Sequence, residues 1–399
     1  MLPLSFLAIL CGFALLVWGA DRFVHGASAT ARNLGVSPLI IGLTIVGFGT
    51  SAPEMLVSAI AAWSGSPDIG IGNAIGSNIT NVGLVLGSTA LLAPLAVNSE
   101  TLRREFPVLF AIMLFSLWLL LDGELSHFDG LLLMGGLAAM VYWIVSLGLR
   151  ERAAEKSGVV DPMASEFAEE IPSGLSQGWA LFWVVVGLLL LLGSSRLLVW
   201  GAVNIAHWLG VSDLVIGLTI IAIGTSLPEL AASITSALKN EPDIALGNVL
   251  GSNMFNLLAV LGMPGLIAPS TIPTAVLQRD YPMMIGLTIA LFAMSYGFRR
   301  PSRVTRLKGL MLLLAFVGYL GWLFVDSKEL EARMQTEVFQ VKNVKCGGCV
   351  ANIQKGLGAM AGVTAVEVAI AGGDVTVTGE HLDRAQLSAK LSELGYPEE

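Results

Sequence analysis

One long segment occurs twice in this chain, and this repeat constrains the fold more than any other feature. Residues 39–87 match residues 214–262 without a gap, so each position has a counterpart at one constant offset in the numbering. About half of the positions are identical, and they include polar and helix-breaking residues: Gly49, Thr50, Ser51, Pro53, Glu54, Asp68, Asn73, Gly76, Ser77, Asn78 and Asn81. Paired segments interrupted by Gly and Pro within apolar sequence are typical of transporter binding sites.

The composition places most of the chain in a lipid bilayer. Of its 399 residues, 54% are hydrophobic and 13% are charged, and the mean hydropathy is +0.75. A soluble protein of this composition would lack a polar surface. The first apolar segment has neither a basic region before it nor a small-residue cleavage site. We therefore interpret it as a spanning helix and not as a signal peptide.

Apolar runs of the length that a spanning helix needs, about 20 residues, predict an all-α polytopic membrane protein with ten transmembrane helices. They lie near 3–20, 37–62, 69–93, 106–121, 129–148, 179–195, 212–238, 244–269, 282–298 and 307–325. The predicted domains are a first repeat at 1–149 with helices one to five, a cytoplasmic loop at 150–177, a second repeat at 178–327 with helices six to ten, a linker at 328–335, and a small domain at 336–399.

Basic residues predict how the helices are oriented, because cytoplasmic loops are enriched in Lys and Arg. The odd-numbered loops carry Arg22, Arg32, Arg103, Arg104, Arg150, Arg152, Lys156, Lys239, Arg299, Arg300, Arg303, Arg306 and Lys308. The opposite loops carry only Arg196 and Arg279. We therefore predict that both termini lie outside the cytoplasm. Five helices per half would insert the second half upside down, so the repeats would be inverted and meet near the midplane.

Prolines inside the repeat predict broken helices. Pro53 and its counterpart Pro228 each remove a backbone hydrogen bond, which lipid tolerates only where the freed carbonyls line a cavity or meet a ligand. We expect unwound backbone at Thr50-Ser51 and at Thr225-Ser226. The hydroxyl and carbonyl groups there would then face an ion.

Glu54 and Glu229, one residue after each proline, are the strongest candidates for a cation site. A carboxylate at the bilayer centre costs at least about 2.5–3.5 kcal/mol, so two related ones need a functional reason. The neighbouring helices add further oxygens: Ser77, Asn78, Asn81, Ser252, Asn253 and Asn256. An oxygen-only site favours Ca²⁺ or Na⁺ over Zn²⁺ or Cu⁺. The structural alternative, in which small residues only let helices pack closely, applies better to the glycines.

The motifs GTSAPE with GSNITN, and GTSLPE with GSNMFN, resemble the two alpha repeats of the Ca²⁺/cation antiporter superfamily, and most closely its prokaryotic sodium/calcium exchangers. The resemblance covers about residues 1–325. It implies ten helices, alternating access, and a cation held by side chains and by two backbone carbonyls. The implied ligands are Thr50, Ser51, Glu54, Ser77, Asn81, Thr225, Ser226, Glu229, Ser252 and Asn256, with the carbonyls of Gly47 and Ala222.

One departure from that family bears on the exchange ratio. Many members carry an aspartate at one of the two positions that Asn81 and Asn256 occupy here. This chain therefore brings two carboxylates to the site instead of three.

The last segment is soluble in composition and contains the pair Cys346 and Cys349 in a C-x-x-C motif. Thiolates at a turn before a helix can chelate a soft metal such as Cu⁺ or Zn²⁺. With its strand–helix–strand–strand–helix pattern, the segment resembles a heavy-metal-associated domain over about residues 336–396, which implies a small α+β ferredoxin-like fold. Val344 replaces the usual Met, and no normal fourth strand fits before Glu399. The alternatives are a domain without metal or a disulfide between the two cysteines.

Together these features predict a secondary active antiporter that exports Ca²⁺ in exchange for Na⁺, located in the inner or plasma membrane. The alternatives are exchange with H⁺ or another cation, or a metal-responsive transporter that the C-x-x-C domain governs. We expect no enzymatic activity, since no H-E-x-x-H or phosphate-binding loop occurs. We also expect no covalent cofactor, no nucleic-acid partner and a monomeric transport unit.

Overall fold

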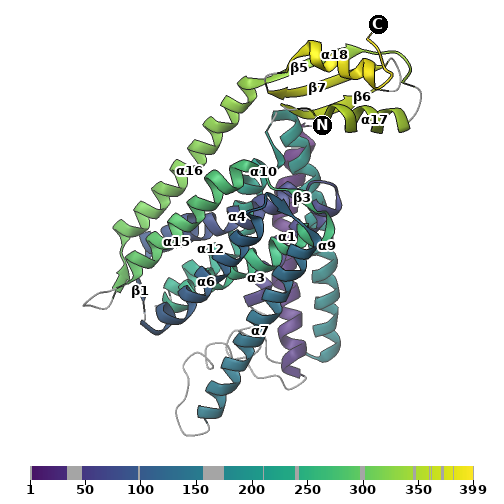
Figure 1. Cartoon of the computed structure of the whole chain (residues 1–399). Coiled ribbons are helices and arrows are strands. Elements are labelled where there is room, and N and C mark those ends of the chain that lie inside the picture. Colours follow the sequence, from purple (N-terminus) through teal and green to yellow (C-terminus); the bar gives the residue numbers. More distant parts are fainter. Residues whose placement is uncertain are drawn as a thin grey trace. The chain divides into compact units, whose positions relative to one another are not determined.

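Figure 1 shows the computed structural model of the chain. It describes residues 2–33, 47–97, 99–155, 175–209, 211–238, 242–296, 302–344, 347–358, 360, 362–369, 373–380 and 382–398. The chain forms two compact units, Met1–Gly321 and Trp322–Glu399. The first is almost wholly helical, whereas the second combines a small sheet with helices.

The first half of the larger unit consists of long helices joined by short connections. Its helices are α1 (Leu2–Asn33), α3 (Gly47–Trp63), α4 (Pro67–Thr80), α5 (Gly87–Leu92), α6 (Ser99–Leu120) and α7 (His127–Glu155). A π-helical segment, η2 (Asn81–Leu86), joins α4 to α5 without a break. Two short strands, β1 (Leu95–Val97) and β2 (Glu124–Leu125), flank α6.

The second half repeats this order. Its helices are α9 (Gln177–Leu209), α10 (Asp213–Ile216), α11 (Ala222–Thr225), α12 (Leu227–Leu238), α13 (Pro242–Phe255), α14 (Gly262–Ile267), α15 (Tyr281–Ser295) and α16 (Arg306–Arg333). Its π-helical segments are η3 (Gly217–Ile221), η4 (Asn256–Val260) and η5 (Val276–Asp280), and its strands are β3 (Ser270–Thr271) and β4 (Ser302–Val304).

The internal repeat extends to the bounds of the elements. Helices α13 and α14 begin and end at the counterparts of the residues that bound α4 and α5, and η4 begins at the counterpart of the first residue of η2. The starts of α1 and α9 are separated by the same offset in the numbering. The same local structure therefore forms twice, down to the position of a π-helical segment within a longer helix.

The chain is a multi-pass membrane protein. Seven described helical segments are long and apolar enough to cross a bilayer: Leu2–Thr30, Pro67–Leu92, His127–Ser146, Gln177–Ile205, Asp213–Leu238, Ala245–Ile267 and Arg306–Asp326. Glu105–Leu120 is apolar but shorter. The start of the second predicted span, before residue 47, lies outside the described residues.

Helices α1 and α9 lie side by side and pack through glycines (Figure 1). An added Cβ at Gly12 would lie 3.1 Å from Leu198 Cβ, and one at Gly26 would lie 2.6 Å from the backbone nitrogen of Val184. From Gly12 to Gly26 along α1, the contacted residues on α9 go from Leu198 back to Val184, so the two helices are antiparallel. Lipid supplies no hydrophobic force between helices, and close approach of their backbones takes its place.

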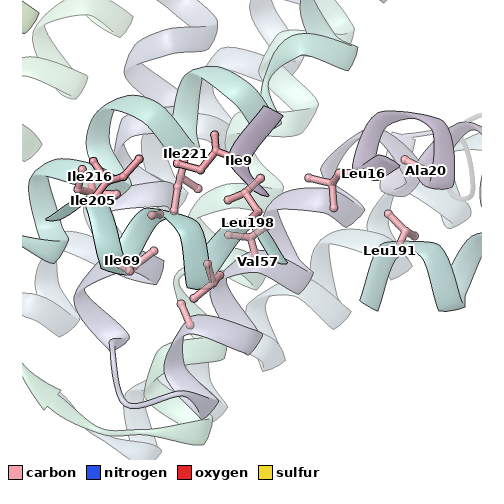
Figure 2. Packing of buried hydrophobic residues seen from close by; sticks show 13 residues of the cluster. Ile9, Leu16, Ala20, Val57, Ile69, Leu191, Leu198, Ile205, Ile216 and Ile221 are labelled. Atoms are coloured by element: carbon pink, nitrogen blue, oxygen red, sulfur yellow. The ribbon is translucent and has the colours of Figure 1, made fainter. Parts of the chain in front are cut away.

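Buried aliphatic side chains connect this helix pair to the repeat. Figure 2 shows Leu16, Leu191 and Leu198 of α1 and α9 in one cluster with Val57 of α3 and Ile69 of α4. The segment around η3 contributes Ile216 and Ile221 to the same cluster. The pair α1 and α9 therefore packs against the helices that carry the repeated polar motifs.

Glycines also bring the two copies of the repeat into direct backbone contact. An added Cβ at Gly72 of α4 would lie 2.5 Å from the carbonyl oxygen of Leu214. An added Cβ at Gly217 would lie 2.5 Å from the carbonyl oxygen of Ile69 and 3.0 Å from the backbone nitrogen of Asn73. Only residues without a side chain allow this approach.

Two short antiparallel ladders join the halves a second time. Strand β1 pairs with β4, placing Leu95 opposite Val304, and β2 pairs with β3, placing Glu124 opposite Thr271. Each ladder thus connects a segment of the first half to a segment of the second through backbone hydrogen bonds.

The smaller unit contains a three-stranded antiparallel sheet. Strands β5 (Met334–Gln340), β6 (Val363–Val368) and β7 (Asp374–Glu380) lie in the order β5–β7–β6, with helices α17 (Gly347–Gly358) and α18 (Arg384–Glu393). Its core includes Phe339, Ile353 and Leu391. Beyond the three strands, an isolated bridge joins Val341 to Glu398.

The charged segment before this sheet is helical. Helix α16 continues to Arg333 and β5 begins at Met334.

We predict that Gly72→Ala and Gly217→Ala each destabilise the protein, because the new methyl group must displace backbone of the other copy. Overpacking costs about 1–3 kcal/mol, and backbone contacts favour the upper end of that range. Thermal unfolding of purified protein in detergent measures the effect. Gly193→Ala on α9 is the matched control, because no described heavy atom lies within 4 Å of its added Cβ. Equal stability of all three variants would contradict the prediction.

Candidate functional site

The two glutamates of the repeat are buried within the helical unit. Glu54 lies on α3 and Glu229 in the first turn of α12, and each residue is about 1% exposed. The two carboxylates are close enough to repel each other electrostatically. Two like charges withdrawn from water need a cation or protons between them.

Most of the other predicted ligands are buried as well. Ser77 lies on α4 and Asn81 is the first residue of η2, while Ser252 and Asn256 occupy the same places on α13 and η4. Ser51, Thr225 and Ser226 are buried too. Gly47 and Thr50 belong to α3, but their side-chain surroundings lie outside the described part of the chain. The carbonyl of Ala222 accepts the Ser226 N–H at 3.2 Å.

Several buried oxygens of the predicted ligand residues have no hydrogen-bond partner among the described residues. They are Ser51 Oγ, both carboxylate oxygens of Glu54, Asn81 Oδ1, Ser226 Oγ and Asn256 Oδ1. Leaving a buried polar atom unsatisfied costs about 1–3 kcal/mol. Unpartnered carboxylate, hydroxyl and amide oxygens are of the type that Ca²⁺ takes as ligands.

The asparagines of the two copies bond to each other reciprocally. Asn81 Nδ2 donates to Asn253 Oδ1 at 3.0 Å, and Asn256 Nδ2 donates to Asn78 Oδ1 at 3.0 Å. Exchanging each residue for its counterpart in the other copy converts the first bond into the second. Reciprocal contacts of this kind are typical of a two-fold interface.

Asn73 is a central residue that the sequence motifs did not single out as a ligand. Its Nδ2 donates to the carbonyl of Glu54 and to Ser58 Oγ, both at 3.1 Å. Its Oδ1 accepts from Ser77 Oγ at 3.3 Å and from Thr225 Oγ1 of the other copy at 3.2 Å. The only indication of this role in the sequence is that asparagine occurs at the equivalent position of both copies, Asn73 and Asn248.

The two copies differ in how they use the equivalent serines. Ser77 donates to Asn73, whereas its counterpart Ser252 donates to Glu229 Oε1 at 3.2 Å. In the second copy the serine hydroxyl therefore binds the carboxylate of Glu229. In the first copy the equivalent hydroxyl binds the side chain of Asn73.

The helix break predicted at Thr225-Ser226 is confirmed only at Ser226, because Thr225 still belongs to α11, and the break predicted in the first copy is wrong. Ser226 (φ −81°, ψ 4°) separates α11 from α12, and Pro228 is the second residue of α12, where its missing N–H costs nothing. In the first copy, α3 runs from Gly47 through Pro53 without interruption. Pro53 still leaves the carbonyl four residues earlier without its helical donor.

The asparagines begin irregular turns of a different kind. Asn81 opens η2 and Asn256 opens η4, and both segments are π-helical insertions within longer helices. Such insertions are frequently found at functional sites. The sequence carries no signal for them beyond the repeat itself.

A second buried charged group lies apart from these residues. Arg279, which the sequence placed in a loop, is buried in η5 and donates to Asp280 Oδ1 at 2.7 Å. Tyr319 of α16 donates to the same oxygen at 2.8 Å. Arg279 is therefore part of an ion pair inside the helical unit and not a loop charge.

The C-x-x-C motif is only partly described. Cys346 lies outside the described residues, while Cys349 lies in the first turn of α17 with its Sγ 3.9 Å from the carbonyl oxygen of Asn343. Among the described residues, no group of three or more His, Cys, Asp and Glu side chains is placed to hold a metal.

Comparison with protein families gives two matches. The model of the sodium/calcium exchanger protein family matches residues 4–146 and 179–325. The model of the heavy-metal-associated domain matches residues 338–397.

Individual proteins resemble the larger unit over nearly their whole length. The chain is 52% identical to the putative antiporter CaxA of Alkalimonas amylolytica over 79% of its own length and 97% of that protein. It is 39% identical to the inner membrane protein YrbG of Escherichia coli, over 79% of this chain and 95% of YrbG. A solved structure of the sodium-calcium exchanger NCX_Mj matches with a TM-score of 0.55 and 31% identity, covering 80% of this chain and 99% of that one.

We predict that Asn73→Ala destabilises the protein by about 3 kcal/mol, because it leaves buried partners on both copies unsatisfied. Asn248→Ala is the matched control, since Asn248 makes a single side-chain bond among the described residues, to Ser233 Oγ at 3.4 Å. Thermal unfolding in detergent, at a fixed salt concentration, measures both. Equal effects of the two substitutions would show that Asn73 does not join the copies.

Proposed function

The chain belongs to the sodium/calcium exchanger family, and on this basis we propose that it is a secondary active antiporter that exports Ca²⁺ in exchange for Na⁺. The proposal rests on two buried carboxylates, Glu54 and Glu229, and on buried oxygens of other predicted ligands that have no hydrogen-bond partner in the described part of the chain. The likeness to NCX_Mj, described as a sodium-calcium exchanger, supports the choice of ions.

The proposed site binds either cation through the same fixed charge. Two carboxylates balance one Ca²⁺ or two Na⁺, so the two ions compete for Glu54 and Glu229. Thr50, Ser51, Ser77, Asn81, Thr225, Ser226, Ser252 and Asn256, with the carbonyls of Gly47 and Ala222, complete the proposed ligand set. Occupancy by either ion would stabilise the conformations that alternate between the two sides of the membrane.

The absence of a third carboxylate shapes the proposed exchange. Asn81 and Asn256 contribute neutral oxygens, so charge neutrality favours two Na⁺ for each Ca²⁺. The alternative driving ion is H⁺, which would protonate the same glutamates. Imposed gradients of Na⁺, K⁺ and H⁺ distinguish these cases.

We propose ten transmembrane helices in two inverted halves, with both termini outside the cytoplasm. The loop charges support this orientation, and YrbG, an inner membrane protein, supports the inner membrane as the location. The transport unit in this proposal is a single chain, because each half supplies one glutamate.

The C-terminal unit is proposed to be a ferredoxin-like domain whose Cys346 and Cys349 bind a soft cation such as Cu⁺ or Zn²⁺. The match to the heavy-metal-associated domain supports this role. In the proposed topology the domain faces an oxidising compartment, where the two thiols would form a disulfide unless a metal or a reductant protects them.

We predict that Glu54→Gln and Glu229→Gln each abolish Na⁺-driven Ca²⁺ uptake, because each removes half of the charge that balances the ion. The measurement is ⁴⁵Ca²⁺ uptake into proteoliposomes under imposed Na⁺, K⁺ or H⁺ gradients. Glu124→Gln, at an exposed position of strand β2, is the matched control and should transport like wild type. Wild-type transport by both Gln variants would refute the site assignment.

The C-terminal thiols lead to a separate prediction. The double variant Cys346→Ser/Cys349→Ser should lose binding of Cu⁺ or Zn²⁺ under reducing conditions, whereas its Ca²⁺ exchange should equal that of wild type. Metal content of the full-length protein and ⁴⁵Ca²⁺ flux are measured in parallel. If added Zn²⁺ or Cu⁺ changes flux in wild type but not in the double variant, the metal-responsive alternative is correct.

A further inference from the structure

The reciprocal asparagine bonds determine which end of each amide faces the candidate site. A carboxamide has a donor end and an acceptor end of similar shape, so its orientation depends on its partners. Asn253 Oδ1 holds the donor end of Asn81, and Asn78 Oδ1 holds the donor end of Asn256. All four residues are buried.

The acceptor ends are left without partners as a result. Asn81 Oδ1 and Asn256 Oδ1 are buried and accept no hydrogen bond from any described residue. The carboxylate oxygens of Glu54 also have no hydrogen-bond partner in the described part of the chain. If either amide were reversed, its NH₂ group would face the cation and repel it.

We propose that Asn78 and Asn253 are positioning residues that orient Asn256 and Asn81 across the interface between the two copies, so that both carbonyl oxygens face the transported cation. This inference rests on the proposed function. Neither Asn78 nor Asn253 touches the ion in this proposal. Each acts through the ligand of the opposite copy.

The position of the four asparagines supports this coupling. Asn81 and Asn256 are the first residues of η2 and η4, where the helical ladder is irregular and the side-chain direction depends on more than helical spacing. The cross-copy bond supplies that second constraint. Since each bond spans both copies, the two carbonyl oxygens are set together.

The two positioning residues differ in one respect that makes the proposal testable. Asn78 Nδ2 donates to the backbone carbonyl of Asn253 at 3.2 Å. Asn253 Nδ2 has no partner among the described residues. Only the acceptor end of Asn253 is therefore used, and Asn253→Asp retains that acceptor, whereas Asn253→Leu removes it at similar volume.

The experiment is a set of double-variant cycles read by cation binding. Purified full-length protein is titrated with Ca²⁺, and separately with Na⁺, while the rise in unfolding temperature gives the apparent dissociation constant. We expect Asn253→Leu to weaken Ca²⁺ binding about tenfold, as loss of one oriented ligand implies. In an Asn81→Ala background the same substitution should have almost no further effect.

The repeat supplies the matched control. Asn78→Leu should couple to Asn256→Ala in the same way, whereas Asn253→Leu with Asn256→Ala should be additive. Asn253→Asp should bind Ca²⁺ at least as tightly as wild type, because it keeps the acceptor oxygen. If Asn253 had only a structural role, the buried charge of Asn253→Asp would weaken Ca²⁺ binding as much as Asn253→Leu does. The proposal would be overturned if the effects were additive in Asn253→Leu/Asn81→Ala and in Asn78→Leu/Asn256→Ala. Weakened Ca²⁺ binding by Asn253→Asp would also overturn it.

The two proposals fail differently. Absence of gradient-driven Ca²⁺ flux in wild type would refute the exchanger function, but the binding titrations would still decide the role of the asparagines. Normal Ca²⁺ flux in wild type, together with additive effects on Ca²⁺ binding in both cross-copy double variants, would refute only the positioning role. Loss of folding in Asn253→Leu together with normal folding and binding in Asn253→Asp would support the need for an acceptor at this position.

Discussion

Repulsion between two buried carboxylates is the constraint on which the helical unit depends. Glu54 and Glu229 come from separate copies of one repeat, so the packing that joins the copies also brings like charges together. Contacts between backbones at Gly72 and Gly217, and hydrogen bonds between asparagines, hold the copies against that repulsion. A bound cation would remove the repulsion, and the free energy gained would then favour occupied states.

Much of this arrangement could be predicted from the sequence because its physical causes are local or repeated. Apolar runs and the spacing of Pro53 and Pro228 indicated a membrane protein with interrupted helices, and oxygen-bearing residue types indicated a hard cation. The repeat then predicted that the two copies would meet. These inferences needed only composition, periodicity and an offset between matching segments.

What the sequence could not reveal depends on contacts between segments. Nothing in the residue types distinguishes Asn73, which joins both copies, from Asn248, which is only half-buried. Nor does a motif state which end of Asn81 faces the site. The sequence placed Arg279 in a loop because Tyr319, which donates to the carboxylate of Asp280, lies far along the chain on α16. The continuous helix at Pro53 shows that one proline pattern can give a break in one copy and none in the other.

The reciprocal bonds between Asn81 and Asn253 and between Asn256 and Asn78 also bear on the ancestry of such a chain. An interface in which each side supplies the same donor and acceptor can form between two copies of a single half-length protein inserted in opposite orientations. Fusion of the halves into one gene keeps that interface but lets each side mutate separately. Ser77 and Ser252 are the same residue type, yet one bonds to an asparagine and the other to a carboxylate, so the two sides of the interface already differ in their contacts.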